Sequence, residues 1–161
     1  MQLKNQVEWA LHCCSILAGL PDGRYLDTKS LAQLHGVPKE YLSKALQALA
    51  KAGLVLSTLG PSGGYRLARA ASGITFWDVV SAIEGPGPAF VCTEIRRNNP
   101  CRPKSTCDAK ACIVARVMWE AEDAWREKLR GMTIAKLVDQ VVEEVPADLM
   151  EATAVWVGER S

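Results

Sequence analysis

Two short apolar runs separated by a glycine-rich turn constrain the fold of this chain more than any other feature. The runs are LVLST at residues 54–58 and YRLAR at residues 65–69, and LGPSGG stands between them at residues 59–64. Short apolar runs on either side of a cluster of Gly, Pro and Ser predict a β-hairpin. What the hairpin belongs to depends on the helices that precede it.

The segment before the hairpin predicts three helices. Residues 5–18 carry apolar side chains at the three- and four-residue spacing of one helix face. Asp27 or Thr28 can cap a short second helix that Gly36 ends, and Pro38 can open a third. Two short helices joined by a tight turn form a helix-turn-helix, and a hairpin directly after them is the wing of a winged helix. The predicted fold class is therefore mainly α, with a winged helix-turn-helix DNA-binding head.

The rest of the chain predicts helices on either side of a long loop. TFWDVVSAI, capped by Thr75, predicts a short helix. The segment after it has no periodicity and therefore predicts a long loop, which is uncommon in a protein unless something organises it. An apolar stripe predicts a helix from about Ala109 to Arg130, long enough to pair with a copy of itself in a homodimer. TIAKLVDQVVEEV predicts one more helix. The expected parts are a DNA-binding region at 1–84, a cysteine-bearing loop at 85–111, and a dimerisation helix with C-terminal helices at 112–161.

The net charge of +1 hides an uneven distribution of charged residues. Residues 1–70 hold eight Lys and Arg against four Asp and Glu, whereas residues 111–161 hold six against ten. A basic N-terminal part favours contact with phosphates, and an α-helix fits the major groove of double-stranded DNA. Lysines of the third helix would position it on phosphates, polar side chains could read bases, and wing glycines let the backbone come close. The candidate DNA contacts are Lys39, Tyr41, Ser43, Lys44, Gln47, Ser62, Gly63 and Gly64, with Tyr41 also partly in the core.

Several other classes of protein find no support in the sequence. No apolar run reaches the roughly 18 residues of a membrane span, and no secretion signal precedes the first helix, so a cytoplasmic protein is expected. The sequence contains no glycine-rich phosphate loop, no GxSxG motif and no HExxH motif. Neither His12 nor His35 has an evident Ser or Asp partner for a hydrolytic triad. We therefore do not expect an enzyme.

Six cysteines and one unusual helix segment indicate metal or redox chemistry. Clustered cysteines in a reducing cytoplasm are more often metal ligands or redox groups than disulfides. The segment EWALHCC at residues 8–14 adds Glu8 and His12, which are four residues apart and therefore share one helix face. The adjacent pair Cys13 and Cys14 is expected to be buried as small hydrophobic residues. The other cysteines are Cys92, Cys101, Cys107 and Cys112.

Three stretches of the sequence resemble a known family. VPKEYLSKALQALAKAGLV, GPSGGYRLA and ITFWDVVSAIEG, in that order, are similar to the winged-helix iron–sulfur regulators that include IscR, NsrR and RsrR. The match extends from residue 1 to about residue 130. The resemblance implies a transcription regulator that binds a palindromic operator as a homodimer, with a long crossing helix at the interface and an iron–sulfur cluster held by the preceding loop. Leu59 stands where the family often has a basic residue, and the cysteine spacing also differs.

The stretches VEWALHCC, FVCTEI and KACIVAR are most similar to the RsrR-type branch of this family. That resemblance implies a redox-sensitive [2Fe-2S] cluster with mixed ligands, in which Cys92 and Cys112 of one subunit meet Glu8 and His12 of the partner subunit. Replacing a thiolate by a neutral imidazole makes such a cluster less negative and raises its reduction potential. Operator binding would then follow the redox state of the cluster.

Other interpretations of the cysteines stay open. The four cysteines from Cys92 to Cys112 have an irregular spacing that a zinc site could use, and Cys101 or Cys107 could replace one of the two helix ligands. Arginines close to the loop cysteines would suit a thiol redox protein, although the sequence has no CxxC motif and a DNA-binding head would be unexplained. A regulator without a cofactor, whose dimer binds a protein or a metabolite, is the remaining possibility.

Overall fold

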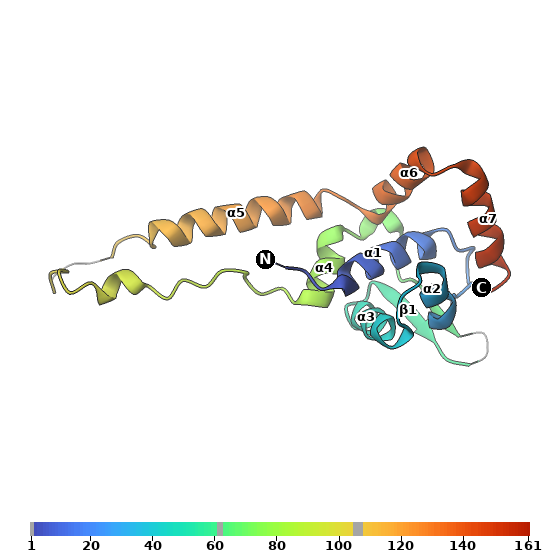
Figure 1. Ribbon diagram of the computed structural model, residues 1–161, viewed down its shortest axis with the longest axis horizontal. Coiled ribbons are helices and arrows are strands. Elements are labelled where there is room, and N and C mark those ends of the chain that lie inside the picture. The colour runs from blue at the N-terminus through green and yellow to red at the C-terminus, as the bar shows by residue number, and fades with distance from the viewer. Residues whose placement is uncertain (1, 61–62, 105–107) are drawn as a thin grey trace.

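The computed structural model describes residues 2–60, 63–104 and 108–161, and it is mainly helical with a two-stranded sheet (Figure 1). The order of the elements follows the sequence prediction up to the last helix. They are α1 (Asn5–Ala18), α2 (Thr28–His35), α3 (Lys39–Lys51), β1 (Val55–Thr58), β2 (Gly64–Leu67), the 3₁₀ turn η1 (Ala71–Gly73), α4 (Phe76–Glu84), the 3₁₀ turn η2 (Ile95–Asn98), α5 (Ile113–Arg130), α6 (Ile134–Glu144) and α7 (Ala147–Gly158).

A single hydrophobic core joins α1, α2, α3 and α4 to the sheet and to α6 and α7. Local sequence sets where these helices begin. The Asp27 carboxylate accepts hydrogen bonds from the backbone N–H groups of Lys29 (2.7 Å) and Ser30 (3.0 Å) and so caps α2. Thr75 and Asp78 form a capping box at the start of α4. The fully buried side chains include Ala10, Leu26, Leu31, Leu42, Leu46, Leu49, Ile74, Val79 and Ile134.

The hairpin is anchored to the head by a close backbone contact. β1 and β2 pair antiparallel, and the N–H of Tyr65 donates a 2.9 Å hydrogen bond to the carbonyl of Leu26. A Cβ atom on Gly64 would lie 2.4 Å from that Leu26 carbonyl oxygen. Only glycine therefore fits where the two backbones meet.

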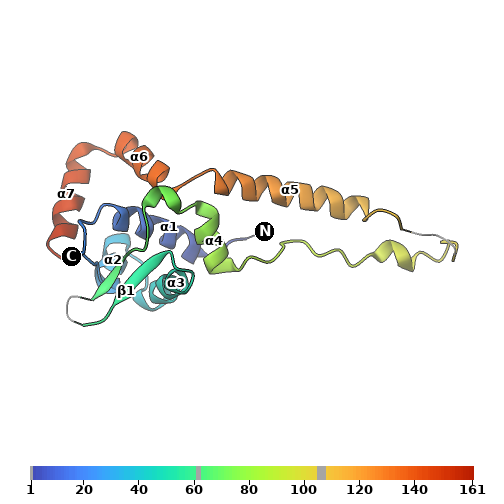
Figure 2. The ribbon, with the colours of Figure 1, turned by 180° about the vertical axis from the view of Figure 1, so that it is seen from behind.

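Residues 85–104 and 108–130 form an arm that extends away from the rest of the molecule, which we call the head (Figures 1 and 2). The chain runs outward as an irregular segment and returns as α5. At the root of the arm, Arg126 of α5 donates hydrogen bonds to the carbonyls of Pro86 (3.4 Å) and Gly87 (3.0 Å), and the N–H of Ala89 donates to Glu122 (3.0 Å). These contacts hold the outgoing segment against the last turns of α5.

Helix α5 begins at Ile113, so the predicted start near Ala109 is wrong. The Lys110 carbonyl accepts a 2.7 Å hydrogen bond from Arg96, whereas in a helix it would accept from the amide four residues later. Cys112 has extended ψ and is the N-cap residue. A long-range contact, which periodicity does not reveal, therefore shortens the helix.

Helix α7 covers residues that show no clear helical periodicity in the sequence. Val157 is buried and Trp156 packs against the core, while Leu149 and Val155 are exposed. Apolar residues on several sides of one helix weaken the periodicity that predicts amphipathic helices. Among the described residues, no helix is long and apolar enough to cross a membrane.

Candidate DNA-binding face and metal ligands

The orientation of α3 is fixed by its leucines. Leu42, Leu46 and Leu49 are fully buried in the core, so the opposite side of the helix faces outward. Tyr41 was expected to lie partly in the core, but 54% of its surface is exposed. That expectation is wrong because the neighbouring Leu42 takes the core position and turns Tyr41 to the outside.

The side chains predicted to contact DNA lie on the outward side of α3. Lys39, Lys44 and Gln47 are exposed and Ser43 is half-buried. Gln47 Nε2 donates a 3.3 Å hydrogen bond to Ser43 Oγ, and Lys44 Nζ lies 5.6 Å from the centre of the Tyr41 ring. This arrangement offers cations for phosphates and an amide and a hydroxyl for base edges. Contact of each residue with DNA stays a prediction.

The glycines of the wing are required by the backbone of the hairpin itself. A Cβ atom on Gly63 would lie 2.6 Å from the Thr58 carbonyl oxygen, and Gly60 has a positive φ of 104°. Gly64 is buried against Leu26 rather than exposed at a free tip. Ser62, the remaining predicted wing contact, lies outside the described residues. Backbone contact between the wing and DNA stays a prediction.

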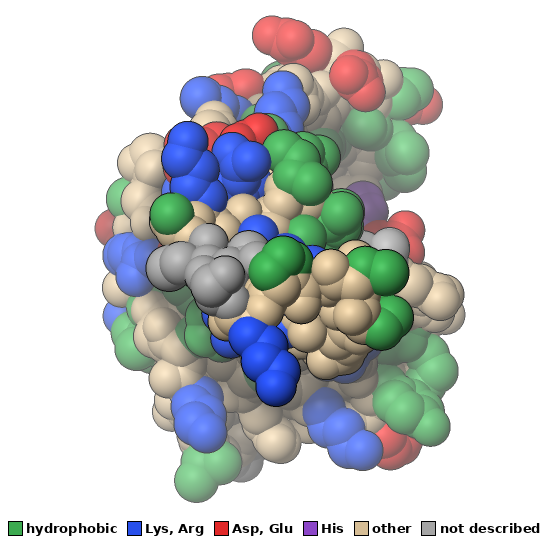
Figure 3. All heavy atoms as spheres, turned by 90° about the vertical axis from the view of Figure 1, so that its left-hand side faces the viewer, with side chains coloured by type: hydrophobic (Ala, Val, Ile, Leu, Met, Phe, Trp, Pro, Cys, Tyr) green, Lys and Arg blue, Asp and Glu red, His purple; other side chains and the backbone are tan. Residues whose placement is uncertain are grey.

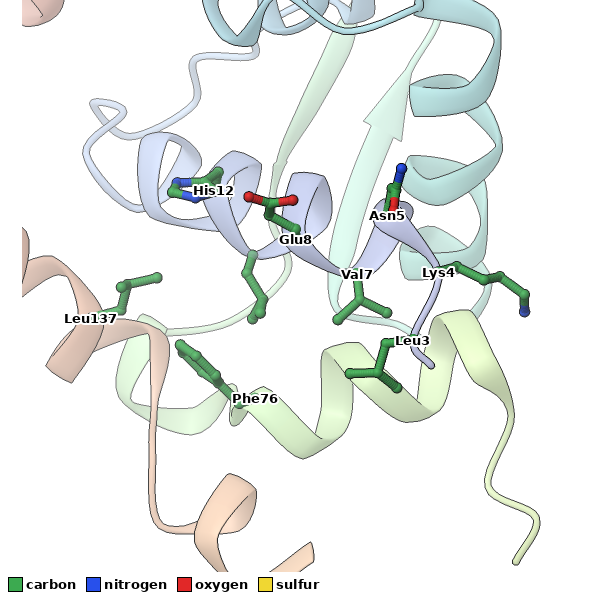
Figure 4. Close-up of a pocket in the computed structure, with 9 residues that line it drawn as sticks. Leu3, Lys4, Asn5, Val7, Glu8, His12, Phe76 and Leu137 are labelled. Atoms are coloured by element: carbon green, nitrogen blue, oxygen red, sulfur yellow. The ribbon is translucent and has the colours of Figure 1, made fainter. Parts of the chain in front are cut away.

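Glu8 and His12 lie one turn apart on α1 and point to the same side of the helix (Figure 4). Both are exposed, and both line a pocket of 390 Å³ together with Val7 and Phe76. Neither side chain makes a hydrogen bond or an ion pair with another described residue. The structure therefore presents a carboxylate and an imidazole side by side with their donor atoms unused.

The sequence analysis did not connect His35 with this pair. Its ring lies 5.8 Å from the His12 ring, centre to centre. Burial, followed by the proximity of His12, lowers the pKa of His35, so its imidazole is neutral at pH 7. His35 Nε2 is buried and has no hydrogen-bond partner within the described ranges. The two histidines are 23 residues apart in sequence, and no periodicity links them.

Cys92 and Cys112 lie on the two segments of the arm, and both are half-buried. The backbone N–H of Glu94 donates a hydrogen bond to Cys92 Sγ at 3.4 Å. Cys112 is the N-cap residue of α5, at the positive end of the helix dipole. Each cysteine therefore lies beside a hydrogen-bond donor or a partial positive charge.

A single chain does not bring the four predicted ligands together. Glu8 and His12 belong to the head, whereas Cys92 and Cys112 belong to the arm that extends from it (Figure 1). In the described part of the chain, no group of three or more His, Cys, Asp or Glu residues is arranged to hold a metal ion. A site made of these four residues therefore needs two chains.

The remaining cysteines differ in burial and reactivity. Cys13 and Cys14 are fully buried, which confirms their prediction as small hydrophobic residues. Burial raises the pKa of each thiol to about 12, with a further contribution from Cys14 at Cys13. Both therefore stay protonated and are poor metal ligands. Cys101 is exposed, and Cys107 lies outside the described residues.

The outer half of α5 exposes an apolar stripe. The exposed fractions are 60% at Ile113, 58% at Val114 and 54% at Val117. Figure 3, which faces the tip of the arm, shows hydrophobic side chains at the surface together with Lys and Arg. Apolar residues repeated along one helix face and left exposed are typical of a surface that meets another protein.

A winged helix with a polar outward face on α3, joined to a long helical arm, defines a class of protein: a DNA-binding transcription regulator. The chain belongs to the Rrf2 family, whose family model, described as an iron-dependent transcriptional regulator, matches residues 3–140. Protein rrf2 of Nitratidesulfovibrio vulgaris is 38% identical over 110 residues, which cover 68% of this chain and 69% of that protein. YwgB of Bacillus subtilis (strain 168) is 29% identical over 144 residues, covering 89% of this chain and 88% of YwgB.

Solved structures confirm the predicted fold class. The global cysteine regulator CymR (YrzC) of B. subtilis superposes with a TM-score of 0.65 at 25% identity, covering 87% of this chain and 98% of CymR. IscR of T. potens gives a TM-score of 0.69 at 22% identity, covering 91% and 93% of the two chains, and supports the fold alone. The relatives are transcription regulators, so this chain is a regulator and not an enzyme.

Proposed function

We propose that this regulator controls its operator through a redox-sensitive [2Fe-2S] cluster shared across a homodimer, as in the RsrR-type branch of the family. Cys92 and Cys112 of one subunit and Glu8 and His12 of the partner subunit would hold it. The observation that carries the proposal is that the structure holds two separate pairs of potential metal ligands. Two thiols lie on an arm that leaves the head, and a carboxylate and an imidazole that form no side-chain hydrogen bond or ion pair with the described residues lie on α1.

The chemistry of the donor set fits an iron–sulfur cluster. Thiolates are the usual ligands, and neutral histidines replace two of them in Rieske centres. The Glu94 N–H that points at Cys92 Sγ is the kind of outer contact that tunes the potential of such centres. When bound, the cluster would supply a reversible one-electron change of charge where the two subunits meet.

The exposed stripe on α5 supports a homodimer. Ile113, Val114 and Val117 lie directly after Cys112 on this helix, so burying them against a second copy would also place Cys112 at the interface. The proposal uses the parts predicted from sequence: a DNA-binding region at 1–84, a cluster-binding loop at 85–111 and a dimerisation part at 112–161. A cytoplasmic location stays a prediction.

The arm is connected to the DNA-binding face by packed contacts. Arg126 of α5 lies over the ring of Trp77 in α4, 4.7 Å from its centre, and Trp77 meets Trp125 edge to face at 5.7 Å. Helix α4 in turn packs against α3. A movement of the arm at the subunit interface would therefore shift the spacing of the two α3 helices on a palindromic operator.

The test of the cluster is a comparison of two α1 variants purified without air. His12→Ala should lose iron or change its visible and EPR spectra, because it removes a ligand. Asn5→Ala is the control, since Asn5 is an exposed residue of the same helix and lines the same pocket. Identical spectra for wild type and His12→Ala would exclude His12 as a ligand. Wild-type protein that stays colourless after reconstitution would reject the cluster itself.

The test of the DNA face is the salt dependence of operator binding. Lys44→Ala should weaken binding and reduce the slope of log K against log salt by about 1, because one phosphate contact is lost. Lys51→Ala, at the far end of α3, is the matched control. An unchanged affinity for Lys44→Ala at equal salt would remove Lys44 from the interface.

A regulator without a metal is the second candidate, favoured by the similarity to CymR, a global cysteine regulator. In that case the dimer would respond to a small molecule or a protein. DNA affinity that is insensitive to oxidants and iron chelators would favour this candidate over the cluster. Zinc without visible absorption would instead select a structural metal site.

A further inference from the structure

Arg96 joins the two segments of the arm that carry the cysteines. Its Nε donates a 2.6 Å hydrogen bond to Glu94 Oε2, and its Nη2 donates a 2.7 Å hydrogen bond to the Lys110 carbonyl. Glu94 follows Cys92 by two residues, and Lys110 precedes Cys112 by two residues. A single planar guanidinium therefore bridges the outgoing and returning chains two residues from each cysteine.

Glu94 has an unusual backbone that serves the same arrangement. Its φ of 54° makes it the one residue other than glycine with positive φ in the described ranges. This conformation is unfavourable for an L residue, because it brings Cβ close to the following carbonyl oxygen. It directs the Glu94 N–H at Cys92 Sγ (3.4 Å) while the side chain receives Arg96. Strain that persists in a loop indicates that the surrounding contacts fix it.

Asp108 forms ion pairs with Arg96 and with two other arginines of the arm. Its carboxylate lies 3.6 Å from Arg96 Nε, 3.2 Å from Arg97 Nε and 2.8 Å from Arg102 Nη2. The hydrogen bond from Arg102, together with that from Arg97 and the nearby positive charges, lowers the pKa of Asp108. The carboxylate therefore stays ionised at neutral pH and restricts where Arg96 can lie.

We propose that Arg96 is a positioning residue that sets the spacing of Cys92 and Cys112 and so prepares one half of the metal site before iron arrives. The proposal rests on the proposed function, because it takes these two cysteines as ligands. The chain between them is 19 residues long, and its described residues form no α-helix or strand, so bringing its ends together carries an entropic cost that the fixed contact through Arg96 lowers. A lysine cannot replace Arg96, because an ammonium group lacks the planar fork of donors that reaches two acceptors at once.

The test compares Arg96→Gln, Arg96→Lys and Arg97→Gln. Arg97 is the matched control, since it neighbours Arg96 and also contacts Asp108, whereas the hydrogen bond to the Lys110 carbonyl comes from Arg96. In protein reconstituted with iron, both Arg96 variants should lose iron to a chelator about 10-fold faster than wild type, as for other outer contacts of metal ligands. Their EPR g-values should also shift, whereas Arg97→Gln should match wild type in both measurements.

A second measurement keeps the two proposals separable. In metal-free protein, hydrogen exchange of residues 92–94 and 110–112 should be faster in both Arg96 variants than in wild type, and unchanged in Arg97→Gln. Chelation rates within twofold of wild type together with unchanged exchange would reject the positioning role of Arg96. An Arg96→Lys variant that behaves like wild type would also reject it. If wild type binds no iron, the cluster proposal fails, and the exchange data alone decide whether Arg96 fixes the two segments.

Discussion

In the head, Leu42, Leu46 and Leu49 of α3 are fully buried, whereas in the arm Ile113 and Val117 of α5 are more than half exposed. Both helices repeat apolar residues at helical spacing. The difference is that α3 packs its apolar face within its own chain, whereas the described residues leave the apolar stripe of α5 uncovered. An amphipathic pattern therefore predicts a helix with one apolar face, but not whether the same chain covers that face.

The largest expected effect comes from truncating a core side chain of the head. Leu46→Ala should lower the free energy of unfolding by about 2–5 kcal/mol, because it removes buried surface and leaves a cavity. Urea unfolding of the metal-free protein, followed by circular dichroism, measures this loss. The change should leave Tyr41 and the rest of the outward face of α3 chemically intact.

The same truncation in the arm provides the contrast. Ile113→Ala should change stability by less than about 0.5 kcal/mol, measured at protein concentrations low enough to keep the chain monomeric. Comparable losses at Leu46 and Ile113 would mean that the arm is packed within one chain, and the comparison between the two regions would then be mistaken.

The difference between the regions also explains how much could be predicted from sequence. The elements of the head other than α7 followed from periodicity, turn residues and caps, because Asp27 and Thr75 act on their own neighbours. Tyr41 was misplaced because periodicity alone does not separate it from Leu42 next to it. Such errors are small, since the contacts that decide them are local.

The arm was predicted less completely because its contacts join residues distant in sequence. Arg96 bonds to the carbonyl of Lys110, 14 residues away, and this bond delays the start of α5. Likewise His35 meets His12 only once α1 and α2 are packed. The four proposed ligands came from the family resemblance, which also assigned Cys92 and Cys112 to one subunit and Glu8 and His12 to its partner, and their role as ligands stays a prediction.

The next largest effect concerns the stripe on α5. Val117→Lys should weaken self-association about 100-fold, which corresponds to about 3 kcal/mol, because a lysine at the interface would bury an unpaired charge. Analytical ultracentrifugation of metal-free protein gives the dissociation constant. If the arm pairs with a second copy, the variant should be monomeric while its head stays folded.

Asp123→Asn is the control for Val117→Lys. Asp123 is exposed on the polar side of α5, and both substitutions change the net charge by the same amount and sign. Asp123→Asn should therefore leave the dissociation constant within a factor of about 3. Equal weakening by both variants would point to charge rather than to burial of the stripe.

A smaller effect is expected where the two regions join. Arg126→Gln removes the hydrogen bonds to Pro86 and Gly87 and the contact with the Trp77 ring, and it leaves the partly buried Glu122 without its cation. Stability should fall by about 2 kcal/mol, and hydrogen exchange at residues 86–89 should become faster. The wing should exchange as in wild type.

Arg130→Gln is the control for Arg126→Gln, because it also removes a positive charge from α5. Arg130 also lies over Trp77, at 5.6 Å, but its ion pair with Glu127 is exposed. Its loss should cost less than about 0.5 kcal/mol. If Arg126→Gln were as mild as Arg130→Gln, the arm would be free to pivot on the head and could not pass a movement to α3.

The smallest effect lies in the head and depends on pH. Burial raises the pKa of Asp27, but hydrogen bonds from the Ser30 hydroxyl and from the backbone N–H groups of Ser30 and Lys29 lower it further, so the net shift is downward. Asp27→Ala should therefore cost about 1 kcal/mol at pH 7 through loss of the α2 cap. The folded state holds the Asp27 proton less tightly than the unfolded state does. This stabilisation is therefore complete above the unfolded pKa of about 4, and it is lost as the pH falls through the lower pKa of the folded state.

Asp27→Asn tests that sign. Asparagine caps a helix about as well as aspartate but does not titrate, so this variant should stay close to wild type at pH 7 and show a flatter dependence of stability on pH below about 4. Urea unfolding from pH 7 down to pH 3 follows all three proteins. A wild-type advantage over Asp27→Ala that grows on acidification would show that the Asp27 carboxylate is not stabilised in its ionised form, and the head would then owe the start of α2 to packing alone.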